Sequence, residues 1–242
     1  MTSPARFHDP SVLRRILDAV RSPNSLVVFD LDSTVLDNRP RQSAILREFG
    51  VARGIAALDH MRPEHWRTWS LADAMARAGL ADASIENTLD DAKQFWRERF
   101  FTSEYCSLDQ AIPGAAEYVR AVLAHGGSVA YCTGRHEAMR HGTQISLGAL
   151  SFPIPSGDRV QLLMKPTFEQ TDDAWKREAF SRLDKLGVVA AAFDNEPMHI
   201  NSYRQHYADA HCVHVDTDHS GRDVKLLDHV VSVKDFVARW SE

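Results

Sequence analysis

Asp30 and Asp32 stand two residues apart at the end of the apolar run Val27-Val28-Phe29. The run predicts a buried β-strand. Because strand side chains alternate with period two, a continuing strand would point both carboxylates to the same side. Two crowded carboxylates repel each other unless a cation shares their site. Since Mg²⁺ prefers oxygen ligands, the pair suggests a magnesium site; the plainer alternative is a strand followed by an Asp/Ser turn.

Three further groups of polar residues follow predicted strands in the same way. They are Thr133-Gly134-Arg135 after the strand 128–132, the region 165–176 after the strand 160–164, and Asp194-Asn195-Glu196 after the strand 188–193. Ligands of open parallel sheets bind outside the carboxyl ends of the strands. We therefore expect the four groups to form one site.

The residue types in these groups suit phosphoryl transfer. An aspartate such as Asp30 can form a covalent aspartyl-phosphate, and Asp32 can protonate the leaving oxygen and then activate water. Thr133 and Gly134, with the backbone N–H groups that open the next helix, can hold phosphate oxygens. A lysine can place positive charge beside the nucleophile. Asp194 can complete an all-oxygen Mg²⁺ site.

The elements that position these residues follow from the pattern of the chain. Strands that alternate with helices predict an α/β fold, a Rossmann-like parallel sheet flanked by helices. In the segment 38–108 strand signals vanish and helical periodicity dominates: a helix from Arg41 is expected to stop at Gly50, Ser70 has the character of an N-cap, and a long helix begins near Ser84. A βαβ crossover needs only about twelve residues, so we expect an all-helical insertion after the first strand.

Composition limits the kind of protein. Of the 242 residues, 44% are hydrophobic, which is enough to bury a core. The formal net charge is -5, whereas nucleic-acid-binding domains usually have a basic surface. No apolar run approaches the roughly 20 residues that span a bilayer, and the first residues lead into no secretory signal. The three cysteines are widely spaced, which suits a reducing compartment. We expect a cytoplasmic protein without a membrane partner; its oligomeric state stays open.

These motifs resemble those of phosphohydrolases of the haloacid-dehalogenase superfamily. The first stands as Asp30-Leu31-Asp32-Ser33-Thr34, the second as Thr133 within Tyr131-Cys132-Thr133-Gly134-Arg135, and the fourth as Phe193-Asp194-Asn195-Glu196-Pro197. They occur in the family's order, and the resemblance covers about residues 26–215.

The resemblance implies roles for individual residues. Asp30 would be the nucleophile and, with Asp194, a direct ligand of Mg²⁺, whereas Asp32 would add its backbone carbonyl to the metal and act as the general acid and base. Asn195 stands where many members have a second acid. The roles of Asn195 and Glu196 at the metal therefore stay open.

The family's third motif, a lysine, has two candidates. Lys165-Pro166 looks like the Lys-Pro of many members. Lys176, in the helix that feeds the Asp194 strand, is placed as in the phosphatase domain of bacteriophage polynucleotide kinase and in some acid phosphatases. We favour Lys176 as the catalytic and phosphate-binding lysine and keep Lys165 as the alternative.

By the same resemblance, residues 38–108 form a cap in the family's first insertion position, and residues 1–37 and 109–242 form the core. Candidates for substrate contacts from the cap are Arg39, Arg41, Trp66, Arg67 and Trp69. The implied activity is Mg²⁺-dependent hydrolysis of a small soluble phosphomonoester through an aspartyl-phosphate on Asp30. Phosphomutase-like transfer and removal of phosphate from nucleotide or nucleic-acid ends are the alternatives, although the acidic balance argues against nucleic acid.

Overall fold

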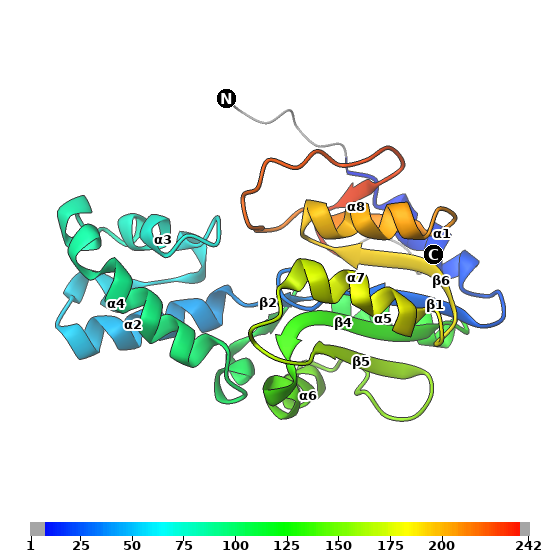
Figure 1. Cartoon of the computed structure of the whole chain (residues 1–242), viewed down its shortest axis with the longest axis horizontal. Helices are drawn as coiled ribbons and strands as arrows, with labels where there is room; N and C mark the ends of the chain where they lie inside the picture. The colour runs from blue at the N-terminus through cyan, green and yellow to red at the C-terminus, as the bar shows by residue number, and fades with distance from the viewer. Residues whose placement is uncertain (1–7, 238–242) are drawn as a thin grey trace.

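A six-stranded parallel sheet organises the chain, in the order β5-β4-β1-β6-β7-β8 (Figure 1). The computed structural model describes residues 8–237, so the N-terminal residues considered for a secretory signal lie outside the described part. The strands are β1 (Ser25–Phe29), β4 (Ser128–His136), β5 (Val160–Lys165), β6 (Val188–Asp194), β7 (His211–Val215) and β8 (Val231–Val233). The predicted α/β class is confirmed.

Helices cover both faces of this sheet, which explains why residues 26–29 of its central strand are all apolar. One face carries α1 (Ser11–Ala19), α5 (Ala115–Ala124) and α6 (Arg140–Ala149), and the other carries α7 (Asp172–Leu183) and α8 (Pro197–His206). All five residues of β1 are buried: Val27 and Phe29 face the first layer, and Leu26 and Val28 face the second. A strand covered on both sides reads as a continuous apolar run rather than as an alternating one.

A helical unit, residues 38–108, projects from the carboxyl end of β1, at the left of Figure 1. It contains α2 (Arg39–Arg53), α3 (Leu71–Arg77), α4 (Asp82–Phe100) and 3-10 turns at 56–60, 63–65 and 104–108. Its apolar side chains form a hydrophobic cluster separate from those on the two sheet faces. Where the chain leaves and returns, β2 (Leu36–Asp37) pairs antiparallel with β3 (Gln110–Ala111). The domain boundaries predicted from the sequence remain a prediction.

One helix end differs from its prediction. Ser70 caps α3 as expected, since its side chain accepts a hydrogen bond from the Asp73 N–H at 3.2 Å. However, α2 continues through Gly50 and ends at Gly54, which has a φ of +67°. A Cβ on Gly50 would lie 2.7 Å from the Leu58 Cβ. The glycine at position 50 therefore serves close packing within the helical unit, and the expected stop there is wrong.

None of the helices in the described part of the chain combines the length and the hydropathy that crossing a membrane requires.

Gly142 tests how the segment after α4, at Ser103, packs on the core. A Cβ at this position of α6 would overlap the carbonyl oxygen of Ser103, while the Gly142 N–H donates to the Ser103 Oγ at 3.1 Å. We expect Gly142→Ala to lower the free energy of unfolding by about 1–3 kcal/mol because backbone atoms must move apart. Denaturant titration measures the change.

The control is Gly148→Ala in the same helix. Its added methyl would meet only the flexible end of Ile154, with Cδ1 3.1 Å away. This change should be neutral or should stabilise the protein by up to about 1 kcal/mol through helix propensity. Equal unfolding free energies for the two variants would contradict the packing argument.

Candidate active site

The carboxyl ends of β1, β4 and β6 border a cavity of about 160 Å³ that also touches the helical unit. All six residues predicted for the site line it, together with Asn195 and Glu196. These six are Asp30, Asp32, Thr133, Gly134, Lys176 and Asp194. The sheet thus brings together residues that are up to 164 positions apart in the sequence, here Asp30 and Asp194.

Asp30 and Asp194 lie side by side because β1 and β6 pair in parallel with Phe29 opposite Phe193. Lys176, from α7, joins them: its Nζ lies 2.6 Å from Asp30 Oδ1 and 2.9 Å from Asp194 Oδ2. The same ammonium donates to the Cys132 carbonyl oxygen at 2.7 Å. All three charged side chains are buried, so each depends on the others for compensation.

Burial and mutual attraction set the protonation of this group. Burial raises the pKa of Asp30 to about 7 although Lys176 opposes the rise, and the neighbouring charge of Asp194 adds to it. Burial also acts to raise the pKa of Asp194, but the Lys176 ammonium and His199 hold it below its usual range. For Lys176, burial favours the neutral form, yet the two carboxylates raise its pKa. The Lys176 ammonium is therefore charged and compensates the negative charge of the two carboxylates.

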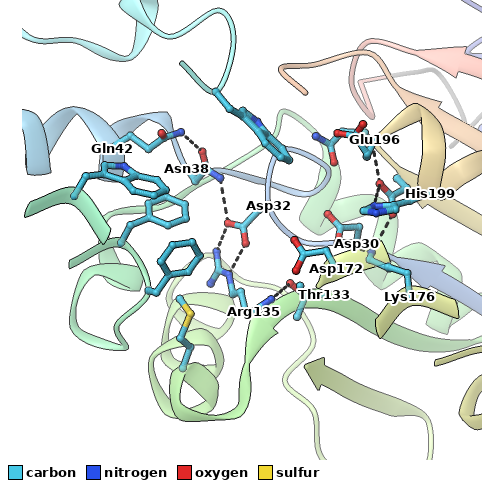
Figure 2. A pocket seen from close by; sticks show the side chains of 18 residues that line it. Asp30, Asp32, Asn38, Gln42, Thr133, Arg135, Asp172, Lys176, Glu196 and His199 are labelled. Atoms are coloured by element: carbon cyan, nitrogen blue, oxygen red, sulfur yellow. Dashed lines mark hydrogen bonds and ion pairs between the residues drawn. The ribbon is translucent and has the colours of Figure 1, made fainter. Parts of the chain in front are cut away.

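Asp32 takes a different set of partners, although it is only two residues away. Arg135 binds it through two hydrogen bonds, with Nε 2.8 Å from Oδ2 and Nη2 2.7 Å from Oδ1. From the helical unit, Arg41 Nη2 lies 2.8 Å from Oδ1, and Asn38 donates to the same oxygen at 3.3 Å. Figure 2 shows the Asp32 carboxylate between Asn38 and Arg135. Both oxygens of Asp32 are thus engaged.

Asp109 completes this second cluster at the point where the chain returns to the core. Its Oδ2 accepts from Arg135 at 2.6 Å, and its Oδ1 lies 3.0 Å from Arg41 Nε, close enough for an ion pair although the N–H is not aligned for a hydrogen bond. Burial acts to raise the pKa of Asp32, but the Arg135 and Arg41 guanidinium groups hold it well below its usual range. The cluster joins buried Arg41, Arg135 and Asp109 to Asp32, whose side chain is 24% exposed toward the cavity.

The second motif lies within β4 rather than after it, because the strand extends to His136. Thr133 is buried and its Oγ1 accepts a hydrogen bond from the Arg135 N–H at 3.1 Å. A Cβ on Gly134 would lie 2.8 Å from the Asp172 carboxyl group, so a side chain here would require the Asp172 carboxylate to shift. The register with β5 is irregular between Thr133 and His136, so Gly134 and Arg135 lie in a break of the β4–β5 pairing that borders the cavity.

The two candidate lysines have different partners. Whereas Lys176 contacts Asp30, the Lys165 Nζ pairs with Asp172 Oδ1 at 2.8 Å and does not line the cavity. The geometry therefore places Lys176 beside the proposed nucleophile.

The residues after β6 hold the Asp194 carboxylate from the other side. The Glu196 N–H donates to Asp194 Oδ1 at 2.9 Å, and the His199 Nδ1 lies 3.7 Å from the same oxygen. The Glu196 carboxylate itself accepts two hydrogen bonds from Ser220, at 2.8 and 3.0 Å. His199 also meets Asp173 Oδ1 at 2.8 Å; burial would lower its pKa, but Asp194 and Asp173 raise it. Glu196 is thus tied to the loop that contains Ser220.

Asn195 anchors the turn after the first motif. Its N–H donates to Thr34 Oγ1 at 3.0 Å, and the single proton of this hydroxyl is shared between two acceptors, Asn195 Oδ1 at 3.1 Å and Asp30 Oδ2 at 3.2 Å. Thr34 therefore links the first motif to the fourth. The Asn195 Nδ2 also donates to the Asp218 carbonyl oxygen at 2.7 Å, a contact that an acidic residue could not make, because an ionised carboxylate accepts hydrogen bonds but donates none.

Besides Trp69, the helical unit adds lining residues that the sequence did not propose for substrate contact. Its lining residues are Asn38, Gln42, Trp69, Trp96, Phe100 and Phe101. Of the candidates for substrate contact, only Trp69 lines the cavity. Arg41 is turned to Asp32, Arg39 pairs with Asp37 at 2.7 Å, Trp66 is buried against Ser43, and Arg67 is exposed on the surface.

Asp30 and Asp194 are also the residues best placed to bind Mg²⁺. Within residues 8–237, no group of three or more His, Cys, Asp or Glu side chains is arranged to bind a metal ion. Mg²⁺, however, is usually bound by one or two carboxylates together with substrate oxygens and water. The paired oxygens of Asp30 and Asp194, with the Asp32 carbonyl implied by the family resemblance, fit that donor set. A cation there would also offset the repulsion that raises the Asp30 pKa.

Comparison with known proteins identifies the fold. No protein-family model matches the chain, and no curated protein matches it in sequence. Among solved structures, protein tyrosine kinase A (PtkA) of Mycobacterium tuberculosis is similar with a TM-score of 0.56 and 15% identity, over 88% of this chain and 94% of the other. A putative phosphatase from Clostridium difficile has a TM-score of 0.51 and 12% identity, over 79% and 84%.

A third similar structure is CbbY from Rhodobacter sphaeroides, solved in complex with phosphate. Its TM-score is 0.50 at 15% identity, over 87% of this chain and 94% of the other. At such identities the likeness shows a common fold, and it extends over most of each chain. It agrees with the Rossmann-like fold that the strand and helix pattern predicted.

The buried arginine cluster gives a stability prediction. Arg135→Met would leave Asp32 and Asp109 short of a partner, and breaking a buried ion pair by removing one member costs about 3–5 kcal/mol. We expect a loss of that size in the free energy of unfolding. The control is Arg140→Met, which removes a half-exposed pair with Glu137 and should cost about 1 kcal/mol or less. Similar losses in both variants would argue against a dependence on the cluster.

Proposed function

We propose that this protein is a Mg²⁺-dependent phosphohydrolase of the haloacid-dehalogenase superfamily that hydrolyses a small phosphomonoester. One observation carries the proposal: Asp30, Lys176, Asp194 and Thr133 converge on one cavity, and Asp32 lines the same cavity with separate partners. The similar folds of a putative phosphatase and of a protein solved with phosphate agree with this reading.

In the proposed first step, an Asp30 carboxylate oxygen attacks phosphorus and forms an aspartyl-phosphate as the bond to the ester oxygen breaks. Asp32 supplies a proton to the departing alkoxide oxygen. In the second step Asp32 takes a proton from water, the water oxygen attacks phosphorus, and the bond to Asp30 breaks to release inorganic phosphate. Lys176 and Thr133 hold the non-bridging oxygens through both steps.

Mg²⁺ bound by Asp30, Asp194 and the Asp32 carbonyl would neutralise phosphate charge and orient the group for in-line attack. Side chains and backbone groups of the protein hold the Asp30 and Asp194 carboxylates in place. The Lys176 ammonium keeps the Asp30 carboxylate oriented, and the Glu196 N–H and His199 fix the Asp194 carboxylate.

The proposed acid must exchange partners during the reaction. Both Asp32 oxygens are bound by guanidinium groups, which favour the ionised form. To deliver a proton, Asp32 must turn one oxygen away from Arg135 or Arg41. Because Arg41 belongs to the helical unit, a movement of that unit relative to the core would change this contact.

We also propose that the helical unit acts as a cap. It contributes six residues to the cavity wall, and the β2–β3 pairing lies where it joins the core. A cap over the site would exclude water from the aspartyl-phosphate except for the attacking molecule.

Asp30→Asn tests the proposed nucleophile. Purified protein with Mg²⁺ should release phosphate from a generic aryl phosphate, a chelator should stop the reaction, and Asp30→Asn should lower kcat by several orders of magnitude. Asp91→Asn, a half-exposed residue of α4 paired with Arg53, is the matched control and should keep full activity. Normal turnover by Asp30→Asn would exclude the mechanism.

The choice between the two lysines can be tested directly. Lys176→Ala removes a charge 2.6 Å from Asp30, so we expect kcat/KM to fall about 10²–10³-fold, the effect of losing one transition-state donor. Lys165→Ala removes a charge paired with Asp172 and should change kcat/KM little. Circular dichroism checks that both variants fold. A larger loss in Lys165→Ala would reverse the assignment.

A further inference from the structure

We propose that the cavity selects a phosphomonoester whose leaving group is small, uncharged and aromatic. This inference rests on the proposed phosphohydrolase function and names the substrate class for the same site.

The two ends of the cavity differ in chemistry. The core contributes the charged residues, whereas the helical unit contributes four aromatic side chains and two amides, and none of these six is charged. In Figure 2 most of the aromatic rings lie on the side of Gln42, across the cavity from Lys176. A phosphate held beside Lys176 would therefore direct its ester group toward the aromatic side chains.

The two amides on that side are already paired. The Gln42 Nε2 donates to Asn38 Oδ1 at 2.8 Å, and the Asn38 Nδ2 donates to Asp32 at 3.3 Å. A sugar with several hydroxyl groups would lose hydrogen bonds to water against the neighbouring aromatic wall and would find few partners there. An apolar group loses nothing in the same place.

The cationic groups of the cavity are paired as well. Lys176 joins Asp30 and Asp194, Arg135 joins Asp32 and Asp109, and His199 contacts Asp173 and Asp194. The lining carries five carboxylates, from Asp30, Asp32, Asp172, Asp194 and Glu196. A second phosphate or a carboxylate on the leaving group would be buried without a cation, which is strongly unfavourable.

The aromatic side chains form a preordered surface. Trp96 stacks on Phe100 with centroids 4.4 Å apart, and Phe101 packs edge-on against both. Trp69 is 43% exposed, and its Nε1 donates to Asp218 Oδ2 at 3.1 Å, which fixes the indole to a core loop. Aromatic groups that pack in this way gain up to about tenfold in affinity beyond the burial of area. Little side-chain entropy is lost when a ring binds to side chains that are already ordered.

The size of the cavity limits the leaving group. Its volume is about 160 Å³, and it opens to solvent where Trp69 is 43% exposed. An apolar cavity of about 150 Å³ is known to hold a benzene molecule. The space is therefore suited to a leaving group of about one ring.

Three phosphate esters of primary alcohols test the inference, because their leaving groups are similar in basicity. We expect kcat/KM to be about tenfold higher for benzyl phosphate than for ethyl phosphate, since stacking adds up to one such factor. The carboxylate-bearing 2-phosphoglycolate should be the poorest of the three. A preference for 2-phosphoglycolate, or equal rates for benzyl and ethyl phosphate, would overturn the proposal.

Binding of uncleavable analogues separates substrate class from catalysis. By calorimetry with Mg²⁺ present, benzylphosphonate should bind about tenfold more tightly than ethylphosphonate. If no ester is hydrolysed but this difference in Kd holds, the proposed phosphohydrolase function fails and the aromatic subsite stands. Equal affinities would overturn the subsite whatever the activity.

Variants of Trp69 test whether its ring causes the preference for benzyl over ethyl esters. Trp69→Ala should reduce the benzyl-to-ethyl ratio of kcat/KM and of affinity toward one, whereas Trp69→Phe keeps a ring and should retain most of it. Val51→Ala, 77% exposed on α2 and outside this cavity, is the control and should keep the wild-type ratio. An unchanged ratio in Trp69→Ala would contradict the role given to its ring.

Discussion

The Lys176 ammonium, held between Asp30 and Asp194, is the interaction on which the rest of the site depends. Parallel pairing of β1 and β6 places the two carboxylates side by side, and burying such a pair without a cation would be strongly unfavourable. The lysine comes from α7, on the face of the sheet where Leu26 and Val28 pack. Because Lys176 must reach both carboxylates, its ion pairs also constrain the position of α7 on the sheet.

A second constraint links the helical unit to the chemistry. The Asp32 carboxylate pairs with Arg135 of the core and with Arg41 of the helical unit. Both arginines also pair with Asp109, at the point where the chain returns from the helical unit to the core. The proposed acid and base thus sits at the junction of the two parts of the chain. Two aspartates that are almost adjacent in sequence acquire opposite electrostatic settings: Asp30 has a raised pKa and Asp32 a lowered one.

The core and the helical unit contribute different chemical groups to the cavity. The sheet supplies charge, which suits phosphate and a metal ion, and the helical unit supplies aromatic surface, which suits an apolar leaving group. Trp69 spans the two, because it lines the cavity from the helical unit and donates to Asp218 of the core. In this arrangement, reaction type follows from the sheet and substrate preference from the helical unit.

The sequence by itself determined the α/β fold, the buried strand before Asp30 and the polar groups near the carboxyl ends of the strands, because periodicity and local spacing encode them, although Thr133 lies within β4 rather than after it. It misjudged Gly50, since a glycine needed for packing looks the same as one that ends a helix. Only the tertiary structure placed Lys176 rather than Lys165 beside Asp30, and only it paired Arg41 with Asp32. These contacts join residues from separate helices and strands. A local sequence pattern cannot predict them, because it does not specify which of two candidate lysines the packing of α7 on the sheet brings to Asp30.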